Sequence, residues 1–110
     1  MTDHEYLTLA EAALASIERS IDDAEMDIEC TRQGSVLTLE FDRGGSIIVN
    51  LQAPMHEIWL AAKAGGYHFS YVDGVWHDAR GGNEFFSLLS KLASEQAGEA
   101  LSFRPPAASV

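Results

Sequence analysis

The first 22 residues carry hydrophobic side chains at the spacing of an amphipathic helix. These side chains recur every three or four positions and share one stripe: Leu7, Ala10, Leu14, Ile17 and Ile21. A second stretch, about residues 83–97, has the same period and is followed by Gly98, a common helix stop. Its shared face carries Phe85, Leu88, Leu89, Leu92 and Gln96. The pattern therefore predicts a helix near each end of the chain.

Between the two helices the hydrophobic period becomes alternating, which is typical of strands with one buried face. The predicted strands are residues 25–30, 36–41, 47–51, 58–62, 67–72 and 75–77. Short glycine-containing links join several of them, so a consecutive antiparallel meander is expected. The expected fold is α+β: a two-layer sandwich with two helices packed on one face of a five- to six-stranded antiparallel sheet. The other face of the sheet is expected to be open to water.

Charge is distributed unevenly along the 110 residues. The formal net charge is −10, and residues 1–29 contribute −8 of it, with nine acidic residues and one basic residue. A negative field of this kind repels nucleic acid and anionic membranes, and it attracts cations or basic protein surfaces. Neither nucleic acid nor a membrane is therefore an expected partner. The excess charge also favours a monomer when no metal is bound.

Carboxylates gather along one edge of the predicted first helix and the strand after it. Glu11, Glu18 and Asp22 cluster beside the apolar stripe, and an antiparallel approach of residues 25–30 would bring a second carboxylate row alongside. Carboxylate oxygens are hard ligands that suit Fe²⁺, Fe³⁺, Mn²⁺ or Ca²⁺, but an open row predicts weak, unselective surface binding. The candidate metal ligands are Glu11, Glu18, Asp22, Asp23, Glu25, Asp27, Glu29 and His4, the histidine that lies among acids. The alternative is a solvated face that only aids solubility.

Trp59 is expected to face the open side of the sheet, because Ile58, Leu60 and Ala62 alternate toward the core. Its expected neighbours on the adjacent strand are the amides Asn50 and Gln52, and His68 is placed on the same surface. A large aromatic side chain ringed by polar groups on a water-facing sheet is typical of a docking surface. The alternative is a tryptophan covered by a loop.

The motifs of the common enzyme classes are absent, so an enzyme is not expected. There is no nucleophile motif, phosphate-binding loop or dinucleotide fingerprint. Cys30 is the only cysteine; it alternates with Met26 and Ile28 and is expected in the core. The N-terminus lacks the pattern of a secretory signal, and no apolar run approaches the roughly 20 residues of a membrane helix. A cytoplasmic protein is therefore expected.

Five motifs occur in order from residue 48 onward. Residues 48–54 read I-V-N-L-Q-A-P and residues 58–61 read I-W-L-A, and G-G-Y-H-F, W-H-D-A-R and E-F-F-S-L-L follow at 65–69, 76–80 and 84–89. In this order they closely resemble the frataxin family, over roughly residues 5–100, and the short length resembles its bacterial branch. The resemblance predicts one domain over residues 1–104. Residues 105–110, which begin with Pro105-Pro106, are expected to be a flexible C-terminal tail.

The resemblance implies iron binding along the acidic edge and docking onto the cysteine desulfurase and scaffold complex that makes iron–sulfur clusters. An iron-binding regulator, donor or sensor of cluster assembly is therefore expected, with Glu18, Asp22, Asn50, Gln52, Trp59 and His68 as the partner-binding residues. The alternative is an acidic interaction module that inhibits without metal. One departure from the family pattern is Glu57, where glutamine usually precedes the Ile-Trp pair.

Overall fold

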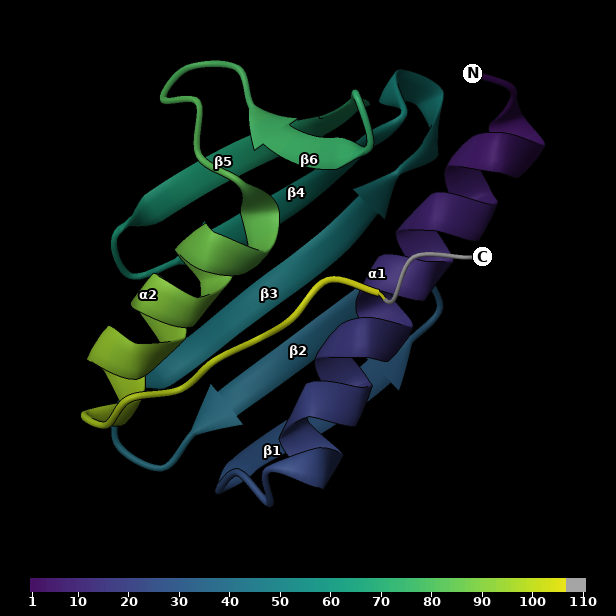
Figure 1. Ribbon diagram of the computed structural model, residues 1–110. Helices are drawn as coiled ribbons and strands as arrows, with labels where there is room; N and C mark the ends of the chain where they lie inside the picture. The colour runs from purple at the N-terminus through teal and green to yellow at the C-terminus, as the bar shows by residue number, and fades with distance from the viewer. Residues whose placement is uncertain (107–110) are drawn as a thin grey trace.

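The computed structural model describes residues 1–106, which form two helices, one short 3-10 helix and six strands (Figure 1). In chain order these are α1 (Asp3–Asp23), β1 (Ile28–Gln33), β2 (Val36–Phe41), β3 (Gly45–Gln52), η1 (Ala53–Met55), β4 (Glu57–Ala62), β5 (Gly65–Val72), β6 (Val75–Asp78) and α2 (Phe85–Ala97). The predicted order of elements is therefore confirmed.

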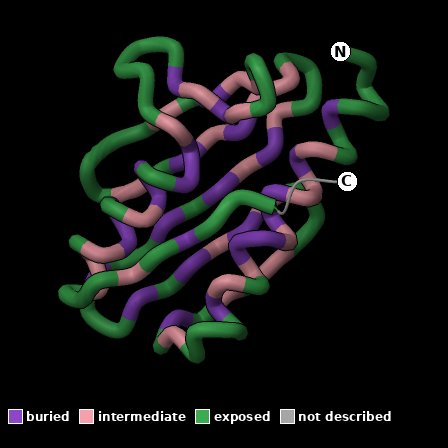
Figure 2. Tube along the Cα trace, viewed as in Figure 1, coloured by how far each residue is buried: buried purple, intermediate pink, exposed green. Residues whose placement is uncertain are grey.

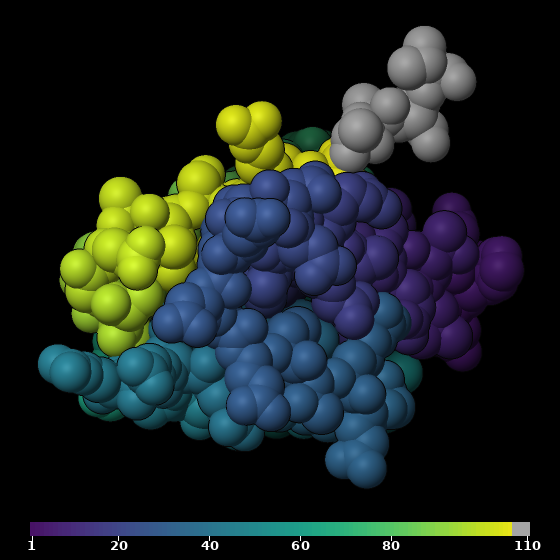
Figure 3. Space-filling view, turned by 90° about the horizontal axis from the view of Figure 1, so that it is seen from below, coloured from purple at the N-terminus to yellow at the C-terminus, as the bar shows by residue number. Residues whose placement is uncertain are grey.

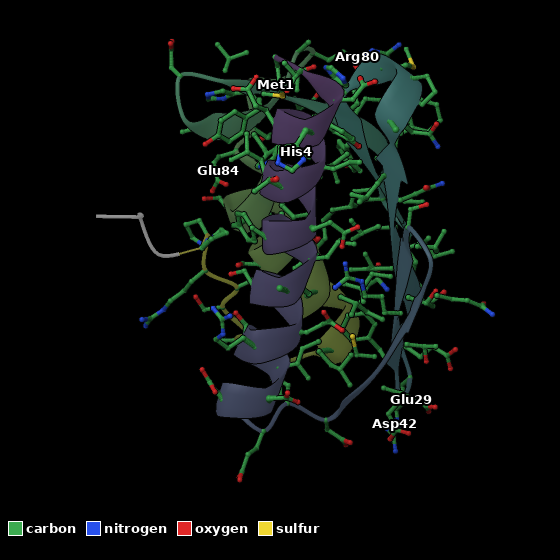
Figure 4. The ribbon with its side chains drawn as sticks, turned by 90° about the vertical axis from the view of Figure 1, so that its right-hand side faces the viewer. Met1, His4, Glu29, Asp42, Arg80 and Glu84 are labelled. Atoms are coloured by element: carbon green, nitrogen blue, oxygen red, sulfur yellow. The ribbon has the colours of Figure 1, made fainter. Side chains whose placement is uncertain are left out.

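The six strands lie in one sheet in the order β1-β2-β3-β4-β5-β6, and every neighbouring pair is antiparallel. Both helices cover the same face of this sheet (Figure 1), and the side view of Figure 4 shows no element on the other face. The expected two-layer α+β sandwich is confirmed. None of the helices in residues 1–106 is long and apolar enough to cross a membrane.

Helix α1 begins at a capping box. The Thr2 hydroxyl accepts the Glu5 backbone N–H at 3.0 Å, and the Glu5 carboxylate accepts the Thr2 N–H at 2.9 Å. These two hydrogen bonds to Thr2 hold the pKa of the Glu5 carboxyl below its usual value. The helix start is therefore encoded locally, by Thr-x-x-Glu.

One predicted position of the α1 stripe is wrong, because Tyr6 is fully buried and Leu7 is 43% exposed. The Tyr6 hydroxyl donates to the Glu57 carbonyl oxygen at 2.7 Å, and the Tyr6 ring stacks on His56 at 4.9 Å. Figure 1 shows the first turns of α1 extending past the ends of β1 and β2. Tyr6 thereby joins the start of α1 to the start of β4, whereas the side chain of Leu7 remains largely in water.

The first strand starts at Ile28 rather than at residue 25. Glu25 has a positive φ of 48°, and the Met26 N–H donates to the carbonyl oxygen of Ile21 at 3.0 Å. These residues form the turn that reverses the chain after α1. Glu25 and Asp27 therefore belong to a turn and not to a strand face. Helix α2 similarly starts two residues later than predicted, because the Glu84 carboxylate caps the N–H groups of Phe86 and Ser87.

The core lies between the sheet and the helices, and buried positions alternate with exposed ones along the strands (Figure 2). Its fully buried members include Leu37, Leu39, Ile47, Val49, Ile58, Leu60 and Phe69. Cys30 was expected in this core but is only half-buried. It lies on β1, the edge strand of the sheet, and packs against the margin of the core.

The segment after α2 runs back between the two helices (yellow in Figure 1) and is held by serine hydroxyls. Ser94 Oγ accepts the Leu101 N–H at 2.8 Å, Ser90 Oγ accepts the Phe103 N–H at 2.8 Å, and Ser16 Oγ donates to the Arg104 carbonyl oxygen. Phe103 is 3% exposed. Of the expected flexible tail, Pro105 and Pro106 are exposed and residues 107–110 lie outside the described residues, so its flexibility stays a prediction.

We expect Phe103→Ala to lower the free energy of unfolding by about 3 kcal/mol, because the ring fills space between the helices that the chain cannot close. Urea denaturation followed by far-UV circular dichroism measures this change. Ser102→Ala is the matched control, because Ser102 is exposed on the same segment. Equal stability of the two variants would show that this segment contributes nothing to the fold.

Candidate metal-binding edge and docking face

The acidic edge contains an internal cation that the sequence analysis missed. Arg32 on β1 forms salt bridges with Glu11 and Glu18 of α1, and the Arg32 Nη1 to Glu18 Oε1 distance is 3.0 Å. Seven residues separate the two glutamates, which is two helical turns, so both project from the same side of α1. The guanidinium, whose several donors suit two carboxylates, joins the helix layer to the edge strand.

Period-two alternation explains where Arg32 points. Ile28 and Cys30 face the helices, and Arg32 is the next residue of that series along β1. This signal was present in the sequence, but the charge count treated the edge as a row of unpaired acids. Two of the predicted ligands, Glu11 and Glu18, therefore already have a counter-charge.

The acids Asp22, Asp23, Glu25 and Asp27 form a group that we call the acidic end, where α1 stops and the chain turns toward β1. All four are exposed, and none of them forms an ion pair with a described residue. Figure 3 looks at this end of the molecule, where the last turn of α1 lies over the strands. Asp23, Glu25 and Asp27 also line an open cleft of about 520 Å³ together with Glu99 and Arg104.

The pKa of Cys30 reflects the negative charge between α1 and β1. Burial, followed by the charges of Glu18 and Asp22, raises the pKa of the Cys30 thiol to about 11. The thiol lies on the helix side of β1, so the carboxylates of α1 act on it across the layer boundary. The acidic edge therefore disfavours any additional negative charge placed there.

Glu29 lies on the opposite face of the sheet from α1. Because Ile28 and Cys30 face the helices, Glu29 faces the open side, directly across from Glu40 on β2. Figure 4 shows Glu29 and Asp42 close together at the same end of the sheet. The expectation that the strand carboxylates join the helix carboxylates in one row is therefore wrong for Glu29.

His4 lies at the far end of α1 from the acidic end, and Figure 4 shows it at the opposite end of the molecule from Glu29. Eighteen residues of helix between His4 and Asp22 correspond to about 27 Å. His4 therefore lies apart from the other candidate ligands, and its own role as a ligand stays a prediction. Within residues 1–106 no three side chains of His, Cys, Asp or Glu come together as a metal site. Any cation at the acidic end would bind to exposed, separate carboxylates.

The open face of the sheet carries the second predicted site. Trp59 is half-buried and lies flat on His68, with ring centroids 4.0 Å apart and an angle of 7° between the planes. Asn50 on β3 lies directly opposite Trp59, and Gln52 lies opposite Glu57. The register thus brings Asn50, Trp59 and His68 into one row across β3, β4 and β5. The register places Asn50, Gln52, Trp59 and His68 where the alternation predicted, while their binding role, like that of Glu18 and Asp22 on α1, stays a prediction.

Glu57 fixes the orientation of Trp59. Its Oε1 accepts the indole N–H of Trp59 at 2.8 Å, and its Oε2 lies 3.5 Å from the Ser70 hydroxyl, which donates to it. Glu57 and Trp59 are two residues apart on β4, so both side chains project from the same face. The residue that departs from the family pattern is therefore part of the surface itself.

Comparison with solved structures places the fold among the frataxins. The frataxin of Psychromonas ingrahamii superposes with a TM-score of 0.88 at 38% identity, covering 94% of this chain and 99% of that one. A trimeric frataxin from the yeast Saccharomyces cerevisiae, complexed with ferrous iron, gives a TM-score of 0.71 at 24% identity, covering 82% of this chain and 86% of that one. The second match shows likeness of fold alone.

The sequence comparisons agree. Residues 1–99 match the family described as frataxin-like domain. The iron–sulfur cluster assembly protein CyaY of Paraburkholderia phymatum is 63% identical over 105 residues, covering 96% of this chain and 100% of the relative. The protein of the same name from Burkholderia mallei is 56% identical over 106 residues, covering 94% and 98%. The chain belongs to the frataxin family, in its bacterial, CyaY-like branch, as the resemblance predicted.

We expect Arg32→Gln to lower the free energy of unfolding by about 1 kcal/mol, because two partly exposed ion pairs between the layers are lost. Arg19→Gln is the matched control, since Arg19 is exposed, forms no ion pair with a described residue and removes the same charge. Thermal unfolding at low and high salt measures both variants, and the Arg32 effect should shrink in high salt. An equal loss of unfolding free energy in the two variants would mean that stability depends on the net charge and not on the Arg32 ion pairs.

We expect alkylation of Cys30 by iodoacetamide to accelerate with pH through pH 9 without reaching a plateau. Only the thiolate reacts, and the raised pKa keeps the thiol protonated over this range. Replacing Glu18 and Asp22 by Gln and Asn should lower the pKa and speed the reaction at a given pH, although burial continues to oppose ionisation. An unchanged rate would mean that the two carboxylates do not act on the thiol.

Proposed function

We propose that this chain is an iron-binding regulator of iron–sulfur cluster assembly that docks on the cysteine desulfurase and scaffold complex in the cytoplasm. The observation that carries the proposal is the match, along nearly the whole chain, to relatives named iron–sulfur cluster assembly protein CyaY. The yeast frataxin solved with ferrous iron supports iron as the metal, by fold likeness.

The acidic end is the part of the edge best suited to take up iron. Its four carboxylates are exposed, and unlike Glu11 and Glu18 they form no ion pair with a described residue. Hard oxygen ligands suit Fe²⁺ and Fe³⁺ and equally other hard cations, and an open arrangement lets water complete the coordination shell. Binding is therefore weak, unselective and electrostatic, and it lies on Asp22, Asp23, Glu25 and Asp27 rather than on the whole predicted set.

The second candidate function is a metal-independent acidic interaction module. It is favoured by the Arg32 ion pairs, which show that a guanidinium group fits between Glu11 and Glu18. A basic patch on a partner protein supplies the same kind of group to the exposed acids without any metal. Its association would be steered by charge and would weaken with salt.

In a Co²⁺ titration followed by ¹H–¹⁵N NMR, we expect the signals of the acidic end to broaden first and those of Glu11 and Glu18 later, because both glutamates are already paired with Arg32. Asp22→Asn with Asp23→Asn should weaken the affinity about tenfold, since two of the four charges are removed. Asp73→Asn with Glu95→Asn removes the same charge elsewhere and is the control. Uniform shifts over the whole chain, or equal effects of the two double variants, would contradict the metal site.

A cysteine desulfurase assay separates the two candidate functions. Asp22→Lys with Asp23→Lys avoids the residues paired with Arg32 and reverses the charge of the exposed acids. Loss of desulfurase binding in metal-free buffer would favour the metal-independent module. Unaltered metal-free binding, together with loss of the iron-dependent change in rate, would favour the iron-binding regulator.

A further inference from the structure

Glu57 carries a negative charge and forms no ion pair within residues 1–106. Its hydrogen-bond partners are the neutral indole of Trp59 and the neutral hydroxyl of Ser70, and none of the salt bridges formed by described residues includes it. The side chain is half-buried against the sheet. A carboxylate withdrawn from water in this way gains more from an opposite charge than a fully solvated one does.

The open face of the sheet carries several acids but no lysine or arginine from a strand. Alternation places Glu29, Glu40 and Glu57 on this face, whereas no lysine or arginine of the six strands points to it. Arg32, the only arginine within a strand, faces the helices and is paired there. His68 and His77 share this face, and Arg80 lines the same open cleft as Glu57, but none of them forms an ion pair with it. The Glu57 carboxylate is therefore open to a basic group of another molecule.

The contacts of Trp59 define the kind of surface that a binding partner must present to it. An indole has one donor, and Glu57 already accepts it, so Trp59 offers a partner only apolar surface. The stack on His68 and the hydrogen bond to Glu57 hold the ring in one orientation before binding. Ordering the ring in advance lowers the entropy that association would otherwise cost.

We propose that Glu57 is a positioning and specificity residue of the docking face. It holds Trp59 flat on His68, and it selects a partner protein surface in which a lysine or arginine stands beside an apolar slot that receives the indole. This inference rests on the proposed docking function and goes beyond it by naming the chemistry of the partner surface. A glutamine at this position could hold the indole but could not select the cation.

Two substitutions separate positioning from charge. Glu57→Gln keeps an oxygen that accepts the indole N–H and removes the charge, whereas Glu57→Ala removes both. In the free protein, the ¹H–¹⁵N signal of the Trp59 indole should stay near its wild-type position in Glu57→Gln and move upfield in Glu57→Ala. The buried Trp76 indole provides an internal reference. An unmoved Trp59 signal in Glu57→Ala would overturn the positioning role.

Binding to the desulfurase and scaffold complex tests the charge. Glu57→Gln should weaken the affinity about tenfold at low salt, and the difference should narrow at high salt. Glu95→Gln, on the exposed side of α2, removes the same charge away from this face and should bind like the wild type. Equal affinity of Glu57→Gln and Glu95→Gln would overturn the selection of a cation.

Double-mutant cycles then locate the partner residue. Lys→Ala and Arg→Ala substitutions on the complex, combined with Glu57→Gln, should identify one basic residue whose loss has little further effect in the Glu57→Gln background. Absence of coupling to every basic residue of the contact surface would also overturn the selection. Failure of the wild type to bind the complex would instead overturn the proposed function, and the indole signal of the free protein would still decide whether Glu57 positions Trp59.

Discussion

Coverage of the sheet on one face only is the constraint on which the rest of this structure depends. Six consecutive antiparallel strands have one face under α1 and α2 and the other in water, so each strand residue belongs either to the core or to the open surface. The hydrophobic effect specifies this division strongly, because a slip of one residue would reverse the face of every side chain in a strand. The positions of Trp59 and Arg32 both follow from it.

The same division separates the acids into groups with different chemistry. Glu11 and Glu18 lie at the seam between the layers, where Arg32 pairs with both and offsets one of their two charges. The acidic end remains exposed, and Glu29 lies on the far face across from Glu40. Like charges directly opposite each other on a sheet are unfavourable, so the open face keeps an electrostatic cost that a basic partner would relieve. The acidic edge is therefore a surface on which some carboxylates are paired and others are exposed, and it is not a preformed metal-binding cage.

The open face of the sheet combines a rigidly held aromatic ring with negative charge. Its central aromatic ring is fixed by neighbours on the same strand and on the next one, Glu57 and His68. Strands hold such a surface more precisely than loops do. The helices bear on this face only indirectly, through the contact of Tyr6 with the Glu57 backbone and through the core beneath it.

The sequence by itself determined the fold class, the order of the elements, the negative end of the molecule and the outward direction of Trp59, because all of these follow from periodicity and local composition. Local motifs also determined the start of α1 at Thr2 and Glu5. Only the tertiary structure decided that Arg32 pairs with Glu11 and Glu18, that His4 lies apart from the acidic end, and that Tyr6 replaces Leu7 in the core. The reason is that ion pairs and burial depend on which distant segments meet, and on how far α1 extends past the strands beneath it, which no local period encodes.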